Sequence, residues 1–76
     1  MRVLVEEIAK ALVDVPEKVE VNQVEGLQAT ILELRVDPAD VGRVIGKQGR
    51  TARSIRSVLS AVSEKHNRRF VLEIVE

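Results

Sequence analysis

The sequence has no cysteine, tryptophan or tyrosine, and only one phenylalanine among its 76 residues. Without cysteine the chain can form no disulfide, thiolate zinc site or thiol nucleophile, and it suits a reducing compartment. With Phe70 as the only aromatic residue, it has no row of rings on which nucleic-acid bases can stack. Glu6, Glu7 and Lys10 interrupt the first ten residues, which excludes a secretory signal or membrane span there. We therefore expect a cytoplasmic protein.

Net charge is also absent, because twelve lysines and arginines balance twelve aspartates and glutamates. The charges are nevertheless unevenly placed. Residues 1–42 hold four basic and nine acidic residues, whereas residues 43–69 hold eight basic residues and one acidic residue. A positive block of this kind is the electrostatic signature of a site for nucleic acid.

The length and the hydrophobic pattern predict a single α+β domain over residues 1–76. Arg2 to Val13 fits an amphipathic helix that ends before Pro16. The apolar face of this helix would be Leu4, Ile8, Ala11 and Leu12. "KVEVNQVEG" and "LQATILELRV" read as a β-hairpin. Because the apolar alternation changes parity between Val21 and Val24, an irregularity is expected near the turn.

The second half predicts two helices and a strand. "DPAD" leads into the short helix "VGRVI", which stops at Gly46. A longer helix runs from about Thr51 to Lys65, followed by a polar loop "HNRR" and a strand "FVLEIV". The apolar stripe of the longer helix would be Ala52, Ile55, Val58, Leu59 and Val62. The predicted order is α-β-β-α-α-β.

A short glycine-bracketed loop separates the last two helices. Gly46 and Gly49 allow a phosphate backbone to approach the main chain without meeting a Cβ atom. Lys47 and Gln48 form the tip, and the start of the next helix adds free N–H groups and a positive dipole. The loop therefore suits an anion, although a plain turn between two helices also commonly uses glycine.

No enzymatic site is predicted. A P-loop needs four residues between its first and second glycine, but Gly42 and Gly46 enclose three, and Gln48 follows Lys47 in place of serine or threonine. His66, the only histidine, has no metal-binding constellation around it. The acidic residues before position 43 fit a solvated face. We expect no catalytic residue, metal, cofactor or small-molecule substrate.

"VIGKQGRTARSI" resembles the K-homology (KH) signature, a V-I-G-x-x-G loop followed six positions later by an apolar residue, here Ile55. The element order resembles the type II KH arrangement, and the whole chain is similar to the KhpA family of small bacterial RNA-binding proteins. The resemblance implies a three-stranded sheet with three helices on one face. It also implies a non-enzymatic RNA chaperone or post-transcriptional regulator, whose loop clamps about four nucleotides of single-stranded RNA.

The site residues implied by the resemblance form one stretch of the chain. The loop would hold the sugar-phosphate backbone, and the end of the preceding helix would line an aliphatic groove for the bases. Arginines at the start of the next helix would extend the phosphate track, with Arg56 mattering less. The predicted RNA-binding residues are Arg43, Val44, Ile45, Gly46, Lys47, Gln48, Gly49, Arg50 and Arg53.

Other partners stay open from the sequence. The same fold can serve as a protein interaction module, pairing with a second copy or with another KH protein. Ser54, Ser57 and Ala61 form a small-residue face that would let two helices approach closely, or they form an ordinary solvated face. The sequence does not distinguish RNA from single-stranded DNA, and no membrane partner is expected.

Overall fold

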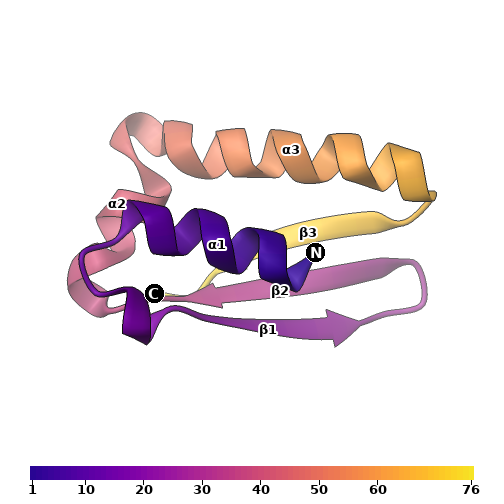
Figure 1. The fold of residues 1–76 in the computed structure, drawn as a ribbon. Helices are drawn as coiled ribbons and strands as arrows, with labels where there is room; N and C mark the ends of the chain where they lie inside the picture. Colours follow the sequence, from indigo (N-terminus) through magenta and orange to yellow (C-terminus); the bar gives the residue numbers. More distant parts are fainter.

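A three-stranded sheet carries its helices on one side in the computed structural model, which describes residues 1–76 (Figure 1). The helices and strands are α1 (Arg2–Leu12), β1 (Glu20–Glu25), β2 (Ala29–Arg35), α2 (Val41–Ile45), α3 (Arg50–His66) and β3 (Arg69–Ile74). Short 3₁₀ turns at Pro16–Lys18, Pro38–Asp40 and Lys47–Gly49 join them. The predicted α+β class and the order α-β-β-α-α-β are confirmed. None of the helices combines the length and apolarity needed to span a membrane.

The sheet is mixed, with β2 at its centre. β1 pairs with β2 in antiparallel fashion, whereas β3 runs parallel to β2, so that α2 and α3 together form the crossover between these two strands. The irregularity predicted near the hairpin turn is wrong, because the register continues without a break from Glu20↔Arg35 to Glu25↔Thr30. Val24 changes the parity of the pattern because it lies on the open face of the sheet, where it is 42% exposed.

The core lies between the sheet and the three helices. On β2, Thr30, Leu32 and Leu34 face the helices and are fully buried, as the two-residue period of a strand requires. The buried apolar cluster consists of Val5, Ala9, Val21, Leu32, Leu34, Val36, Val44, Ile55, Leu59 and Leu72. Since α1, α2 and α3 all contribute to this cluster, all three helices pack on the same face of the sheet.

The predicted buried faces of two helices need correction. In α1, Leu4 is 38% exposed and Ala11 is also exposed, whereas Val5 and Ala9 are fully buried. The stripe that packs on the sheet is Val5, Ile8, Ala9 and Leu12. Both stripes have helical spacing, so the period alone did not choose between them. In α3, Val58 stands outside the core at 45% exposure.

Half of the segment "HNRR", which was predicted as a loop, belongs to the neighbouring helix and strand. His66 ends α3, and Asn67 takes the left-handed conformation, with φ of 51°, that commonly closes a helix. Arg69 begins β3. Only Asn67 and Arg68 therefore connect the helix to the strand.

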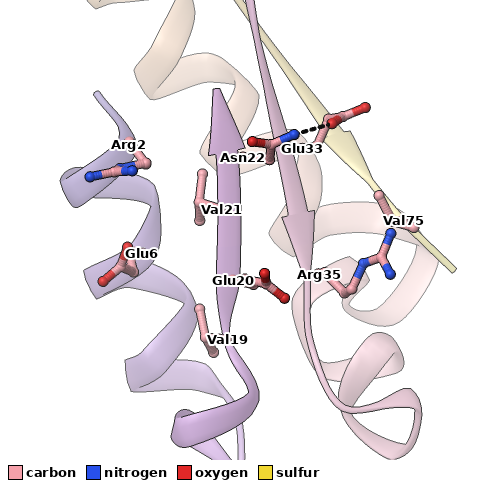
Figure 2. A pocket seen from close by; sticks show the side chains of 9 residues that line it. All are labelled: Arg2, Glu6, Val19, Glu20, Val21, Asn22, Glu33, Arg35 and Val75. Atoms are coloured by element: carbon pink, nitrogen blue, oxygen red, sulfur yellow. Dashed lines mark hydrogen bonds between the residues drawn. The ribbon is translucent and has the colours of Figure 1, made fainter. Parts of the chain in front are cut away.

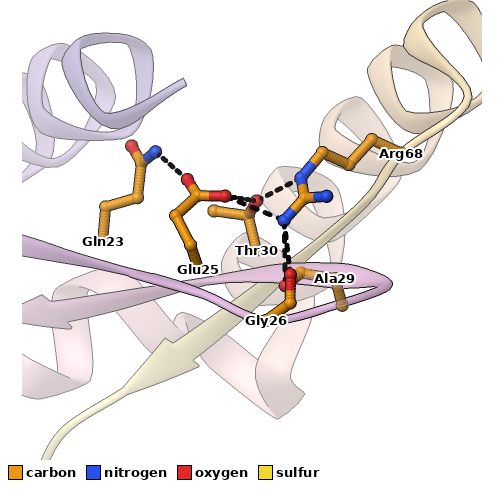
Figure 3. Close-up of polar contacts among 6 residues, drawn as sticks. All are labelled: Gln23, Glu25, Gly26, Ala29, Thr30 and Arg68. Atoms are coloured by element: carbon orange, nitrogen blue, oxygen red, sulfur yellow. Dashed lines mark hydrogen bonds and ion pairs between the residues drawn. The ribbon is translucent and has the colours of Figure 1, made fainter.

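Arg68, which directly follows α3 and Asn67, forms hydrogen bonds and an ion pair with the β1–β2 turn (Figure 3). Its Nε donates to Thr30 Oγ1 at 2.7 Å, and its Nη2 donates to Glu25 Oε2 at 2.8 Å and to the Gly26 carbonyl at 3.0 Å. Hydrogen bonds to the Glu25 carboxylate from Gln23, Thr30 and Arg68 lower the pKa of Glu25. Arg68, although part of the positive block, is thus used for contacts within the protein.

Candidate nucleic-acid interface

The glycine-bracketed loop is a sharp turn in which three of four residues have positive φ. Gly46 has φ of 78° and ψ of 169°, Gln48 has φ of 58°, and Gly49 has φ of 73°. The Gly46 N–H donates to the Gly42 carbonyl at 2.8 Å, and the Gly49 N–H donates to the Gly46 carbonyl at 3.1 Å. The chain thus reverses within a few residues, and α3 begins at Arg50 directly after the loop.

The two glycines serve different purposes. A Cβ atom on Gly46 would overlap Thr51 Oγ1 and lie 2.7 Å from Thr51 Cβ and 2.8 Å from the Thr51 nitrogen, so packing alone forbids a side chain there. The φ and ψ of Gly46 also lie in a region that essentially only glycine adopts. A Cβ atom on Gly49 would meet no atom within 4 Å. Gly46 is therefore required for the loop to pack against Thr51, whereas the missing side chain of Gly49 leaves the main chain of the loop accessible.

Unpaired positive charge surrounds this loop. Lys47 and Gln48 are exposed at its tip, and Arg50 and Arg53 are exposed on the first turns of α3. The Arg53 guanidinium reaches back to within 3.5 Å of the Gln48 carbonyl oxygen. Within the positive block, the intrachain ion pairs involve only Arg43 and Arg68, so the charges at the loop are free for a ligand.

The start of α3 adds to this positive region. Gly49 precedes the helix, and no side chain caps its first turn. The first N–H groups of a helix have no partner inside the helix, and they carry the positive end of its dipole. Lys47 and Arg50 therefore flank the positive end of the α3 dipole, where the Arg50 N–H donates to the Lys47 carbonyl.

Two of the predicted site residues are engaged elsewhere. Arg43 pairs with Asp14 at 2.9 Å and with Asp40 at 3.6 Å. Asp40 is 2% exposed and accepts a hydrogen bond from the Val15 N–H at 3.1 Å. Val44 is fully buried in the core. Arg43 thus ties α2 to the chain that follows α1, and Val44 packs α2 into the core.

A groove runs from the loop along the free edge of β3. Its first part, about 310 Å³, lies between a helix side and a strand side. The helix side has Ile45, Gly49, Ala52 and Arg56, and the strand side has Leu72 and Ile74 together with the carboxylates of Glu73 and Glu76. A second part, about 420 Å³, continues beside the C-terminal half of α3. Both parts are lined by Arg56 and Leu72, so they lie side by side along α3 and β3.

The main chain of β3 contributes polar groups to the groove. The Val75 N–H donates to the Leu34 carbonyl at 2.9 Å, which directs the odd-numbered residues of β3 toward β2. The N–H and C=O groups of Leu72 and Ile74 then point to the free edge, where no further strand pairs with them. These groups can hydrogen-bond to the edge of a base as they would to another strand.

The groove walls on α3 and β3 extend beyond the predicted site. Ile45 and Gly49 were predicted and do line the groove. Ala52, Leu72 and Ile74 were not predicted as site residues, and Arg56 was ranked low. Only the tertiary packing of β3 beside α3 brings these residues together. The one local indication in the sequence was Ala52, whose small side chain next to the loop leaves room for a groove.

The largest cavity lies away from the loop, at the exposed edge of β1 (Figure 2). Its volume is about 710 Å³, and its charged residues have both signs. They are Arg2, Glu6, Glu20, Glu33 and Arg35. Asn22 Nδ2 donates to Glu33 Oε1 at 3.0 Å across this surface. None of the residues that line it comes from the positive block of residues 43–69, so this cavity is a poor candidate for nucleic acid.

The mixed sheet, the element order and the Gly-x-x-Gly turn between α2 and α3 define a type II KH domain. The chain belongs to the KhpA/KhpB KH-domain family, whose model matches residues 2–74. The family resemblance seen in the sequence is thereby confirmed.

Full-length relatives support the same assignment. The chain is 55% identical over 75 residues to the RNA-binding protein KhpA of Clostridium acetobutylicum, which covers 99% of this chain and 100% of the relative. It is 56% identical over 75 residues to the RNA-binding protein KhpA of Clostridium perfringens, with the same coverage. The RNA-binding protein KhpA of Aquifex aeolicus is 53% identical over 73 residues, 96% of this chain and 92% of the relative. No solved structure matches the chain at a significant level.

The two loop glycines should respond differently to alanine. Gly46→Ala should lower the free energy of unfolding by about 3 kcal/mol or more, because the Cβ overlaps Thr51 in a conformation that alanine avoids. Gly49→Ala should cost about 1 kcal/mol, for the left-handed conformation alone. Urea unfolding followed by circular dichroism measures both.

Gly42→Ala is the control for this series. Gly42 lies in α2, and a Cβ atom there meets nothing within 4 Å, so alanine should stabilise the protein by about 0.5 kcal/mol. Equal losses for Gly46→Ala and Gly49→Ala would contradict the close contact between Gly46 and Thr51.

Proposed function

We propose that this protein binds single-stranded RNA, with the phosphate backbone on the loop and the bases in the groove along β3. The observation that carries the proposal is the free charge at the loop. Lys47, Arg50 and Arg53 have no carboxylate partner and surround the uncapped start of α3. The relatives named RNA-binding protein KhpA support RNA as the polymer.

The phosphate contacts would provide affinity without reading sequence. Lys47 and the Gln48 amide donate to phosphate oxygens at the loop tip, and Arg50 and Arg53 meet the next phosphates along α3. Gly49 lets the sugar-phosphate chain come close to the main chain because no side chain stands in the way. A KH loop of this kind clamps about four nucleotides.

The bases would lie in the groove against aliphatic side chains. Ile45 and Ala52 form the helix wall, and the main-chain groups of Leu72 and Ile74 supply donors and acceptors on the strand wall. Base-edge contacts of this kind provide the sequence preference. The protein acts by equilibrium binding, without catalysis, as an RNA chaperone or post-transcriptional regulator in the cytoplasm.

A pairing function through α3 is the second candidate. The exposed Val58 lies one turn after Ser54 and one turn before Ala61, so an apolar side chain that the sequence pattern had assigned to the core borders this face. The hydroxyls of Ser54 and Ser57 donate to main-chain carbonyls of α3 at 2.9 and 3.1 Å, which leaves them compatible with a close helix contact. The occupant would be a second copy or another KH protein, as the family name KhpA/KhpB suggests.

Sedimentation of the wild type and of Val58→Arg tests the pairing function. A dimer through α3 should dissociate in the variant, because a buried guanidinium has no partner on this face. A wild-type protein that sediments as a monomer at every concentration would exclude the homodimer.

Charge reversal at the loop tip tests the RNA proposal. Lys47→Asp combined with Gln48→Asp places two carboxylates where phosphates should bind, and both side chains are exposed. Affinity for a labelled single-stranded octaribonucleotide should fall roughly 100-fold or more, because juxtaposed like charges cost several kcal/mol. Fluorescence anisotropy gives the affinity, and circular dichroism confirms that the variant stays folded.

A matched control separates a local effect from net charge. Lys18→Asp combined with Gln28→Asp makes the same change in charge at exposed positions near β1. This double variant should bind RNA nearly as well as the wild type. Equal weakening by both double variants, or wild-type affinity in the loop variant, would contradict the proposed site.

A further inference from the structure

The far part of the groove has features that the loop does not explain. This cavity of about 420 Å³ lies beside the C-terminal half of α3 and the start of β3. Arg56, Ser60, Arg69 and Phe70 are among the residues that line it. Its volume falls within the range of sites for small organic ligands.

We propose that this cavity is an additional nucleotide subsite, in which a base of the bound strand contacts the Phe70 ring and neighbouring phosphates meet Arg56 and Arg69. The inference rests on the proposed function, because the strand reaches this cavity by following the groove from the loop. It extends the interface beyond the nucleotides that the loop clamps.

Phe70 is held in place for such a contact. The ring is half-buried, so part of it packs against the core and part faces the cavity. The Phe70 N–H donates to Ser63 Oγ at 2.9 Å, and Ser63 Oγ donates to the Leu59 carbonyl at 2.7 Å. These bonds fasten the first residues of β3 to α3, which fixes the backbone that carries the ring. An aromatic ring accepts any base, because every base has a π-face.

The polar residues of the cavity are free to bind a ligand. Arg56 and Arg69 are exposed and form no ion pair, although the neighbouring Arg68 is bound to Glu25. Ser54, Ser57 and Ser63 donate their hydroxyls to carbonyls of the preceding turn of α3. Ser60, the remaining serine of α3, has no such bond and lines the cavity. Two arginines without ion pairs and one free hydroxyl thus line the same cavity as Phe70.

Continuity with the loop favours a strand over a separate ligand. Arg56 and Leu72 line both parts of the groove, so this cavity lies directly beside the part next to Gly49. A strand that leaves the loop along β3 passes Arg56 before it reaches Phe70. A single nucleotide would have only the far cavity and would bind far more weakly than a strand that also occupies the loop.

Strand length provides the test. Affinities for a tetraribonucleotide and an octaribonucleotide are compared in the wild type, Arg69→Gln and Phe70→Leu. Both variants should weaken octanucleotide binding by about fivefold to tenfold, the range expected for one stacked base or one phosphate contact. Both should leave tetranucleotide binding within about twofold of wild type, because the loop holds the short strand. Arg2→Gln, which removes the same charge at the β1 edge, should change neither affinity.

Proton NMR of the wild type gives a second measurement that needs no variant. The chain has one phenylalanine and no tyrosine or tryptophan, so the Phe70 ring signals are unambiguous. They should shift with the octanucleotide and stay unchanged with the tetranucleotide or with a free mononucleotide at the same concentration. A shift with the mononucleotide alone would overturn the subsite as part of a strand interface.

The outcomes separate this inference from the proposed function. If both RNAs bind, but Arg69→Gln and Phe70→Leu affect them equally or not at all and the ring signals stay unchanged, the subsite is wrong while the loop site stands. If the wild type binds neither RNA, the proposed function fails, and the subsite fails with it.

Discussion

The close contact between Gly46 and Thr51 is the constraint on which the site depends. Because no Cβ atom separates the two residues, α2 ends directly against the first turn of α3, and Lys47 and Gln48 project as a short exposed tip. The start of α3, which no side chain caps, follows the turn directly and lines the groove beside β3. A wider turn would separate the cations, the helix end and the groove. The packing requirement at Gly46 therefore also determines where the exposed cations of the loop lie.

The basic residues between positions 43 and 69 fall into two groups, those that form ion pairs within the protein and those that do not. Arg43 and Arg68 pair with carboxylates of the acidic N-terminal half, Asp14, Asp40 and Glu25, and so join the two halves of the chain. The remaining basic residues of the block have no carboxylate partner. The neutral total thus conceals a surface that keeps free positive charge along the loop and α3, which is where a polyanion can be neutralised.

Local patterns in the sequence predicted the element order and the loop, because helical periods, strand alternation and glycine spacing act over a few residues. They did not choose between the stripes containing Leu4 and Val5, since both fit a helical period. The roles of Arg43 and Arg68 and the β3 wall of the groove were also beyond reach. Arg68 contacts Glu25 across 43 positions of the chain, and only the folded arrangement of the strands shows such a contact.

The salt dependence of RNA affinity tests most directly the claim that the unpaired cations at the loop bind phosphates. Each phosphate neutralised on a single strand contributes about −0.7 to the slope of log affinity against log salt concentration, so contacts by Lys47, Arg50 and Arg53 to a tetranucleotide predict about −2. Arg53→Gln should reduce the slope by about 0.7, whereas Arg43→Gln, which loses an ion pair within the protein, should leave it unchanged. A slope near zero, or the same loss of slope in both variants, would contradict the account.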